Sequence, residues 1–224
     1  MIMIPDLAPG VAVALARPPE ADPGVLSAAE AERLHGFAHP ERRRSFVLGR
    51  TVARRLVAQA EGGEPREARL RVGVDGAPRV DGSPRYLSIS HAGRGRALVA
   101  GAALAPRRVG LDLELIQPRR PDLWTRILRP DEHALLDAVG GATDEGQTLL
   151  WSLKEAVLKA RRTGFRAGAR SVRLHEIGTA TAATALATDS DGGRWALAYR
   201  RWHDVWVCVA LHDAGSREIG PDSA

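Results

Sequence analysis

An Asp and a Glu stand two residues apart in the segment Val109-Gly-Leu-Asp-Leu-Glu-Leu115. Because alternate side chains of a strand share a face, Asp112 and Glu114 should point one way, with Gly110 leaving open space beside them, while the apolar residues point into a core. Two such carboxylates suit Mg²⁺, which completes its shell with water and phosphates. In isolation, a D-x-E is more often a solvent-facing strand with ordinary acids.

Both lysines of the chain fall in one segment, Leu150-Trp-Ser-Leu-Lys-Glu-Ala-Val-Leu-Lys-Ala160. All other basic residues are arginines, which indicates a GC-rich codon bias, and arginine does not replace lysine where a compact point charge is needed. On a helix, Glu155 and Lys159 lie one turn apart with Lys154 adjacent. Glu155 can then be a further metal ligand while the ammonium groups neutralise phosphate oxygens. The alternative is an exposed Glu–Lys pair of small energetic weight.

Two further segments have polar groups that suit anions. Tyr86-Leu-Ser-Ile-Ser-His-Ala-Gly93 reads as a strand that runs into a glycine turn, where Ser90, His91 and backbone N–H groups can hold a phosphate. Ordinary turn chemistry is the alternative, and the G-x-S-x-G context of a hydrolase is missing. A helix begins with the basic residues Arg42-Arg43-Arg44 and carries Arg50 further along. Anion binding and a solvated helix face explain these arginines equally well. Scattered histidines without H-E-x-x-H or C-x-x-C disfavour zinc.

The elements that position these groups follow from periodicity and turn signals. We expect strands at 3–16, 69–74, 86–90, 96–102, 108–115, 171–177, 181–187, 194–201 and 204–211. We expect helices from a capping box at Ser27 and Glu30 to about Phe37, over 40–60, over 131–138 after Pro130, and over 148–161, with a break at 118–121. The fold class is α+β, with halves at 1–106 and 107–212 and a flexible tail at 213–224.

The amino-acid composition indicates which broad class of protein this chain belongs to. The chain of 224 residues is 44% hydrophobic and 26% charged, as expected of a globular protein with a sizeable core. The single cysteine, Cys208, excludes an internal disulfide and indicates a reducing compartment. No stretch has the roughly 18 apolar residues of a membrane span, and the N-terminus lacks a basic leading segment, so we expect a cytoplasmic protein without a signal peptide or membrane partner.

In this order, the segments resemble the Sfp-type 4′-phosphopantetheinyl transferases. The family signature G-x-D-x-E stands at 110–114, W-S-x-K-E-A-x-x-K at 151–159 and S-x-S-H at 88–91, and the resemblance runs from about residue 40 to about 160. It implies a pseudo-twofold pair of similar α+β halves with coenzyme A in the cleft between them. It also implies an Mg²⁺-dependent holo-carrier-protein synthase that moves phosphopantetheine from coenzyme A to a carrier serine and releases 3′,5′-ADP.

The resemblance implies roles for single residues. Asp112, Glu114 and Glu155 would be ligands of Mg²⁺, or of Mn²⁺ as a substitute, with the metal bridging the pyrophosphate. Glu155, Lys154 and Lys159 would be catalytic: Lys159 contacts the pyrophosphate and Lys154 handles a proton. The base would be Glu155, directly or through a metal-bound water, or else a lysine with a lowered pKa. The residues implied beside coenzyme A are Arg42, Arg50, Gly76, Pro78, Ser90, His91, Asp112 and Lys159.

One departure from the family pattern and one open register concern the first half. Gly76-Ala-Pro78 stands where many members have Gly-Lys-Pro beside the nucleotide, so that lysine contact is lost, with Arg79 as a candidate replacement. The resemblance favours Arg42 and Arg50 near the 3′-phosphate, whereas helical spacing pairs Arg43 with Arg50. The register within the arginine triplet is therefore open.

Expected partners are apo acyl or peptidyl carrier proteins of polyketide, peptide-synthetase or fatty-acid type. We therefore expect a role in secondary metabolism. Carriers are usually acidic, so the excess of arginine would favour the encounter. Two halves in one chain make a monomer sufficient. One alternative is a non-catalytic module that binds coenzyme A or a carrier. Another is a nucleic-acid-binding domain, suggested by a pI near 10.2, but aromatic residues are only 4% and no such motif is found, so we expect no nucleic-acid partner.

Overall fold

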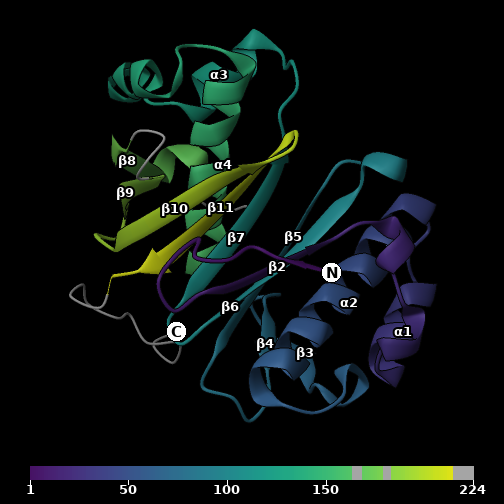
Figure 1. The fold of residues 1–224 in the computed structure, drawn as a ribbon. Helices are drawn as coiled ribbons and strands as arrows, with labels where there is room; N and C mark the ends of the chain where they lie inside the picture. Colours follow the sequence, from purple (N-terminus) through teal and green to yellow (C-terminus); the bar gives the residue numbers. More distant parts are fainter. Residues whose placement is uncertain (163–167, 179–182, 214–224) are drawn as a thin grey trace.

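Two antiparallel sheets form the framework of the computed structural model, which describes residues 1–162, 168–178 and 183–213 (Figure 1). The first sheet has six strands in the order β1-β2-β6-β5-β4-β3, and the second has five in the order β7-β11-β10-β9-β8. The strands are β1 (Ile2–Met3), β2 (Ala12–Ala16), β3 (Leu70–Val72), β4 (Pro78–Val80), β5 (Tyr86–Ala92), β6 (Val99–Ala105), β7 (Val109–Leu115), β8 (Val172–Ile177), β9 (Thr184–Asp189), β10 (Arg194–Trp202) and β11 (Val205–His212).

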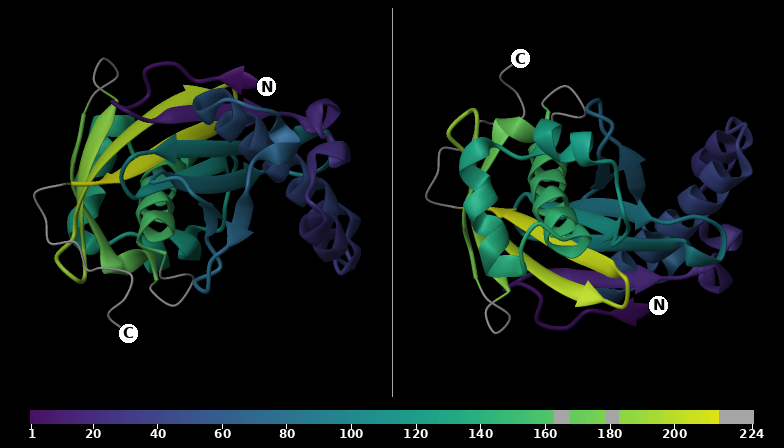
Figure 2. Two further views of the ribbon diagram at one scale, coloured as in Figure 1. Left: turned by 90° about the horizontal axis from the view of Figure 1, so that it is seen from below. Right: turned by 90° about the horizontal axis from the view of Figure 1, so that it is seen from above.

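Each sheet is covered on one face by one long helix, and the two sheets pack together through their other faces (Figure 1 and Figure 2). Helix α2 (Pro40–Glu61) packs on β2, β5 and β6, and helix α4 (Asp144–Arg161) packs on β7 and β11. Val13 of β2 and Val207 of β11 belong to the core between the sheets. The layers therefore run helix, sheet, sheet, helix, and the predicted α+β class with two halves is confirmed.

Local sequence signals set the helix ends. Ser27 and Glu30 exchange the predicted capping-box hydrogen bonds, which begin α1 (Ala28–His35). Prolines are the first residues of α2, of α3 (Pro121–Ile127) and of the 3-10 helix η5 (Pro130–Val139), where a missing N–H has no consequence. Short 3-10 turns lie at Pro18–Glu20, Pro23–Val25, Pro65–Glu67, Gly95–Ala97 and Ala169–Ser171. No helix in the described part of the chain could cross a bilayer.

The structure departs from the predicted elements, and three of the departures have local causes. The single strand expected at 3–16 is instead the antiparallel pair β1 and β2, because the chain turns between them, with Gly10 at a φ of 73°. Strand β4 was not expected, since the Gly, Asp and Pro residues around it read as turns. The break expected at 118–121 ends in helix α3, for which Pro121 is a start rather than a stop. Residues 181–182 of the expected strand 181–187, and the expected tail after Asp213, lie outside the described residues.

Candidate active site

Strand β5 of the first sheet and strand β7 of the second meet at a seam held by serine side chains. The hydroxyl oxygens of Ser88 and Ser90 accept hydrogen bonds from the backbone N–H groups of Leu111 and Leu113, at 2.9 and 3.1 Å. Strand β7 is the outermost strand of its sheet, so these N–H groups have no partner strand on that side. The seam therefore places the S-x-S-H segment beside the G-x-D-x-E segment.

The buried carboxylate of Asp112 binds side chains from both halves at this seam. Lys159 Nζ lies 2.6 Å from Asp112 Oδ1 and 2.7 Å from Ser90 Oγ. Ser152 Oγ donates a hydrogen bond to Asp112 Oδ2 at 2.8 Å. Asp112 is 3% exposed, whereas a third of the Lys159 side chain remains exposed, so its ammonium group can still meet a ligand. The structure thus brings together three residues that the sequence predicted to share a site.

Gly110 allows helix α4 to lie directly on β7. A Cβ atom at this position would overlap the carbonyl oxygen of Ala156 and come within 2.6 Å of the amide nitrogen of Ala160. The prediction that Gly110 leaves open space beside the acids is therefore wrong, because the helix backbone fills that space. The close approach lets Ser152 and Lys159 reach Asp112.

Glu114, the second strand acid, is paired with an arginine. Arg119 Nη2 donates a hydrogen bond to Glu114 Oε2 at 2.6 Å, and its guanidinium carbon lies 4.3 Å from the centroid of the Trp151 ring. Burial and, to a lesser extent, the charge of Asp112 raise the pKa of Glu114 to about 7, against the opposing charges of Arg119 and Lys159. The negative charge of Glu114 is therefore only partly compensated.

Glu155 joins the same electrostatic neighbourhood from helix α4. It is half-buried and accepts a long hydrogen bond, 3.4 Å, from Trp151 Nε1. Burial raises the pKa of Glu155, and the charge of Asp112 adds to the increase. Asp112 therefore influences both other acids that the sequence predicted as metal ligands.

His91 is exposed at the end of the S-x-S-H segment. Dehydration of the imidazolium by surrounding protein atoms lowers the pKa of His91, and the nearby Lys159 ammonium lowers it further. Both effects favour the neutral imidazole, a state that still donates one hydrogen bond.

The three carboxylates fit Mg²⁺ in donor chemistry but do not form a closed ligand set. Within the described ranges, no three or more His, Cys, Asp or Glu side chains are arranged to hold a metal ion. Lys159 and Arg119 instead occupy oxygens of Asp112 and Glu114. The cluster nevertheless has three carboxylates and two side-chain cations, Lys159 and Arg119, so a divalent cation would compensate the remaining negative charge.

Lys154 does not join this group. Its ammonium nitrogen lies 2.6 Å from Glu132 Oε2 and donates to the carbonyl oxygens of Ile127 and Val172, and its side chain is completely buried. Burial lowers the pKa of Lys154, and Glu132 opposes the change. The two lysines bind different acids, because residues five positions apart on a helix point about 140° apart. The structure therefore does not bring Lys154 beside Lys159, and its predicted catalytic role stays a prediction.

The arginines of helix α2 are engaged within the first half. Arg50 is 8% exposed, with Nε 3.4 Å from Glu30 Oε1 and with Nη1 buried and unpaired among the described residues. Arg42 lies over the ring of Phe37 at 5.0 Å, and Arg43 donates to the Phe37 carbonyl. Contact of Arg42 or Arg50 with a 3′-phosphate stays a prediction.

Gly76 and Pro78 lie where β3 turns into β4. Gly76 has a φ of 78°, which favours glycine, and Pro78 is the first residue of β4. Arg79 Nη2 lies 3.0 Å from Asp75 Oδ2, and Arg162, at the end of α4, approaches the same carboxylate at 3.9 Å. Their contact with a nucleotide likewise stays a prediction.

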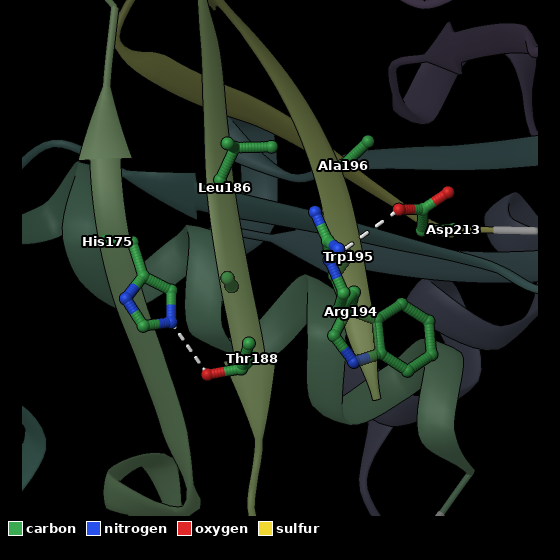
Figure 3. Close-up of a pocket in the computed structure, with 8 residues that line it drawn as sticks. His175, Leu186, Thr188, Arg194, Trp195, Ala196 and Asp213 are labelled. Atoms are coloured by element: carbon green, nitrogen blue, oxygen red, sulfur yellow. Dashed lines mark hydrogen bonds and ion pairs between the residues drawn. The ribbon is translucent and has the colours of Figure 1, made fainter. Parts of the chain in front are cut away.

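A pocket of about 260 Å³ lies elsewhere, on strands β8, β9 and β10 (Figure 3). His175 binds Thr188 at its rim, and Arg194 faces Asp213. The pocket is lined by His175, Leu186, Ala187, Thr188, Arg194, Trp195, Ala196 and Asp213. None of the residues predicted to act on phosphates lines it.

Four residues of the site were not singled out from the sequence. Ser88 is two residues from Ser90 and so shares its strand face, and Trp151 and Ser152 belong to the W-S-x-K-E motif. The sequence therefore contained a signal for these three residues, but their spacing did not indicate what they contact. Arg119 had none, because it follows β7 in an irregular segment of an arginine-rich chain.

Comparison with known proteins agrees with this geometry. Residues 108–210 match the model of the 4′-phosphopantetheinyl transferase superfamily. The chain is 29% identical over 181 residues to the 4′-phosphopantetheinyl transferase HetI of Nostoc, covering 77% of this chain and 72% of HetI. It is also 29% identical over 160 residues to a 4′-phosphopantetheinyl transferase of Bacillus subtilis, covering 68% of each chain. The part matched by the superfamily model contains Asp112, Glu155 and Lys159, so the chain is similar to the 4′-phosphopantetheinyl transferases in the region that holds the site.

Proposed function

We propose that this enzyme transfers 4′-phosphopantetheine from coenzyme A to a serine hydroxyl of an apo carrier protein. The serine oxygen forms a bond to the β-phosphorus, the bond from that phosphorus to the bridging oxygen breaks, and 3′,5′-ADP leaves with the electron pair. The serine proton passes to a base on the enzyme. The observation that carries the proposal is the joining of Asp112, Ser90 and Lys159 across the seam.

Lys159 is the residue we assign to the pyrophosphate. Its ammonium group is fixed by Ser90 and Asp112 but keeps a third of the side chain exposed. A fixed cation next to phosphate oxygens stabilises charge that develops as the bond breaks, without reorganisation at that moment. His91, exposed beside it, can donate a hydrogen bond to a phosphate.

Glu155 is the base we favour. Its carboxylate is half-buried on α4, the helix that also carries Lys159, and a carboxylate placed beside the reacting groups can accept the serine proton. Lys154 is not assigned a part in the reaction, because Glu132 and backbone carbonyls enclose its ammonium group. We keep Arg42 and Arg50 as the proposed partners of the 3′-phosphate, supported by the unpaired Nη1 of Arg50.

Mg²⁺ is the proposed metal, held by Asp112, Glu114 and Glu155. When bound, it would neutralise charge on the pyrophosphate and compensate the excess negative charge of these acids. The acceptors we propose are carriers of fatty-acid, polyketide or peptide-synthetase type. The formal charge of +5 supports an encounter with acidic carriers.

Intact-mass measurement of apo carriers incubated with enzyme, coenzyme A and Mg²⁺ tests the proposal. We expect a phosphopantetheine increment that EDTA abolishes and that slows at least about a hundredfold in Asp112→Asn. Asp122→Asn is the matched control, because Asp122 is an exposed acid that pairs with exposed arginines. Coenzyme A binding without modification of any carrier type would identify a non-catalytic binding module instead.

A further inference from the structure

Arg119 links the two elements that present the carboxylates of the site. Its Nη2 lies 2.6 Å from Glu114 Oε2 on the strand side, and its guanidinium lies over the ring of Trp151 on the helix side. Trp151 in turn donates its indole N–H to Glu155. The Arg119 side chain is 18% exposed, so this contact is not an ordinary surface ion pair.

The guanidinium of the half-buried Arg119 is held by few hydrogen bonds. Its Nε is buried and has no hydrogen-bond partner among the described residues. Arg54, by comparison, binds Glu30 and three backbone carbonyls, as expected of an arginine with a fixed structural role. Releasing Glu114 from Arg119 therefore breaks one charged contact and leaves the stacking on Trp151 available.

We propose that Arg119 is a built-in counter-cation, which holds Glu114 while no divalent ion is bound and competes with that ion for this carboxylate. The inference rests on the proposed function only in that the ion is the one assigned to Asp112, Glu114 and Glu155. While Glu114 accepts the charged hydrogen bond from Arg119, one of its carboxylate oxygens is engaged and must be released before it can bind a metal ion. Arg119 is thus a positioning residue, which sets the affinity of the site for metal.

Direct binding of Mn²⁺ to the full chain, followed by electron paramagnetic resonance of the free ion, tests this proposal without coenzyme A or turnover. Arg119→Gln should lower the dissociation constant about tenfold, because it removes a unit positive charge beside the metal ligands. Arg119→Lys keeps the charge and should stay within about threefold of wild type. Should the glutamine variant fail to fold, Arg119→Met removes the charge and keeps apolar contact with Trp151.

The matched control is Arg120→Gln, the loss of the same charge one residue away. Arg120 is 86% exposed and pairs with Asp122, so its removal should change Mn²⁺ affinity less than about twofold. An equal gain in Arg120→Gln, or an unchanged or weaker affinity in Arg119→Gln, overturns the proposal.

Two further outcomes separate this inference from the proposed function. If no protein of the series binds Mn²⁺, both the Arg119 proposal and the metal assignment are wrong. If wild type binds Mn²⁺ and Arg119→Gln binds it more tightly, but no carrier is modified, the Arg119 proposal holds and the transfer reaction is rejected.

Discussion

Lys154 and Glu132 form an ion pair in which Nζ and Oε2 lie 2.6 Å apart and neither side chain is more than 1% exposed. Glu132 also accepts hydrogen bonds from the backbone N–H groups of Arg129 and Leu174, so the pair ties η5, α4 and β8 together. One of the chain's two lysines therefore stabilises the second half from within.

Lys154→Ala should lower the free energy of unfolding by about 3–5 kcal/mol, because it leaves the Glu132 carboxylate buried without a cation. Lys154→Met combined with Glu132→Leu should recover part of this loss. Urea denaturation measures both. A variant of unchanged stability with abolished transfer activity would instead give Lys154 the catalytic role predicted from the sequence.

Gly110→Ala should be among the most destabilising small substitutions in the chain. Its methyl group would overlap the Ala156 carbonyl, so α4 must move away from β7, at a cost of about 3 kcal/mol or more. Gly168→Ala is the control, because that position has an ordinary φ of −63° and no described residue within 4 Å of an added Cβ atom. Thermal unfolding compares the two, and equal effects would contradict the close packing described above.

Ser88→Ala tests the seam without touching Asp112. It leaves the buried N–H of Leu111 without an acceptor, which should destabilise the protein by about 1–3 kcal/mol. Ser190→Ala, at an exposed turn, should change stability by less than about 0.5 kcal/mol. Hydrogen exchange gives a local measurement, since the Leu111 amide should exchange faster in Ser88→Ala; unchanged exchange would contradict the prediction.

Glu114 should make the metal-free protein less stable as pH rises. Its pKa in the folded state is about 7, against an ordinary value of 4.5, so the folded state binds the proton more tightly than the unfolded state. The resulting stabilisation is complete below the ordinary pKa and is lost as pH rises through about 7. It amounts to at most about 3 kcal/mol, less the screening of a partly exposed group.

Denaturation in EDTA across this pH range measures the effect against Glu114→Gln, which does not titrate. Wild type should lose stability relative to the variant as pH rises from about 5 to about 8. A constant difference would show that the Glu114 carboxylate is already well compensated in the folded protein.

The sequence predicted most of the site because its chemistry lies on regular elements. Period-two alternation placed Asp112 and Glu114 on one face of β7, and the scarcity of lysine drew attention to Lys159. Lys154 was misplaced because α4 is buried around most of its circumference, so no polar face shows which way each lysine points. Which way a side chain of such a helix points depends on what packs against the helix. Here Gly110 of β7 lies against one side of α4, and Glu132 of η5 lies against another.

The parts of the site and of the fold that the sequence did not predict depend on irregular segments. Arg119 lies between β7 and α3, where no periodicity fixes the chain, and its pairing with Glu114 depends on how that segment folds back over Trp151. The same is true of β4, whose pairing with its neighbours overrides turn-forming residues on both sides. Tertiary contacts determine the position of Arg119 and the formation of β4. The spacing of residues along the sequence does not predict such contacts.

Ser90 accepts the Leu113 amide with the same oxygen that meets the Lys159 ammonium group. The alignment of the two sheets and the position of the ammonium group are therefore coupled through this one oxygen. Any sliding of one half against the other moves the charge assigned to the phosphates, so the rigidity of the core between the sheets sets the precision of the chemistry.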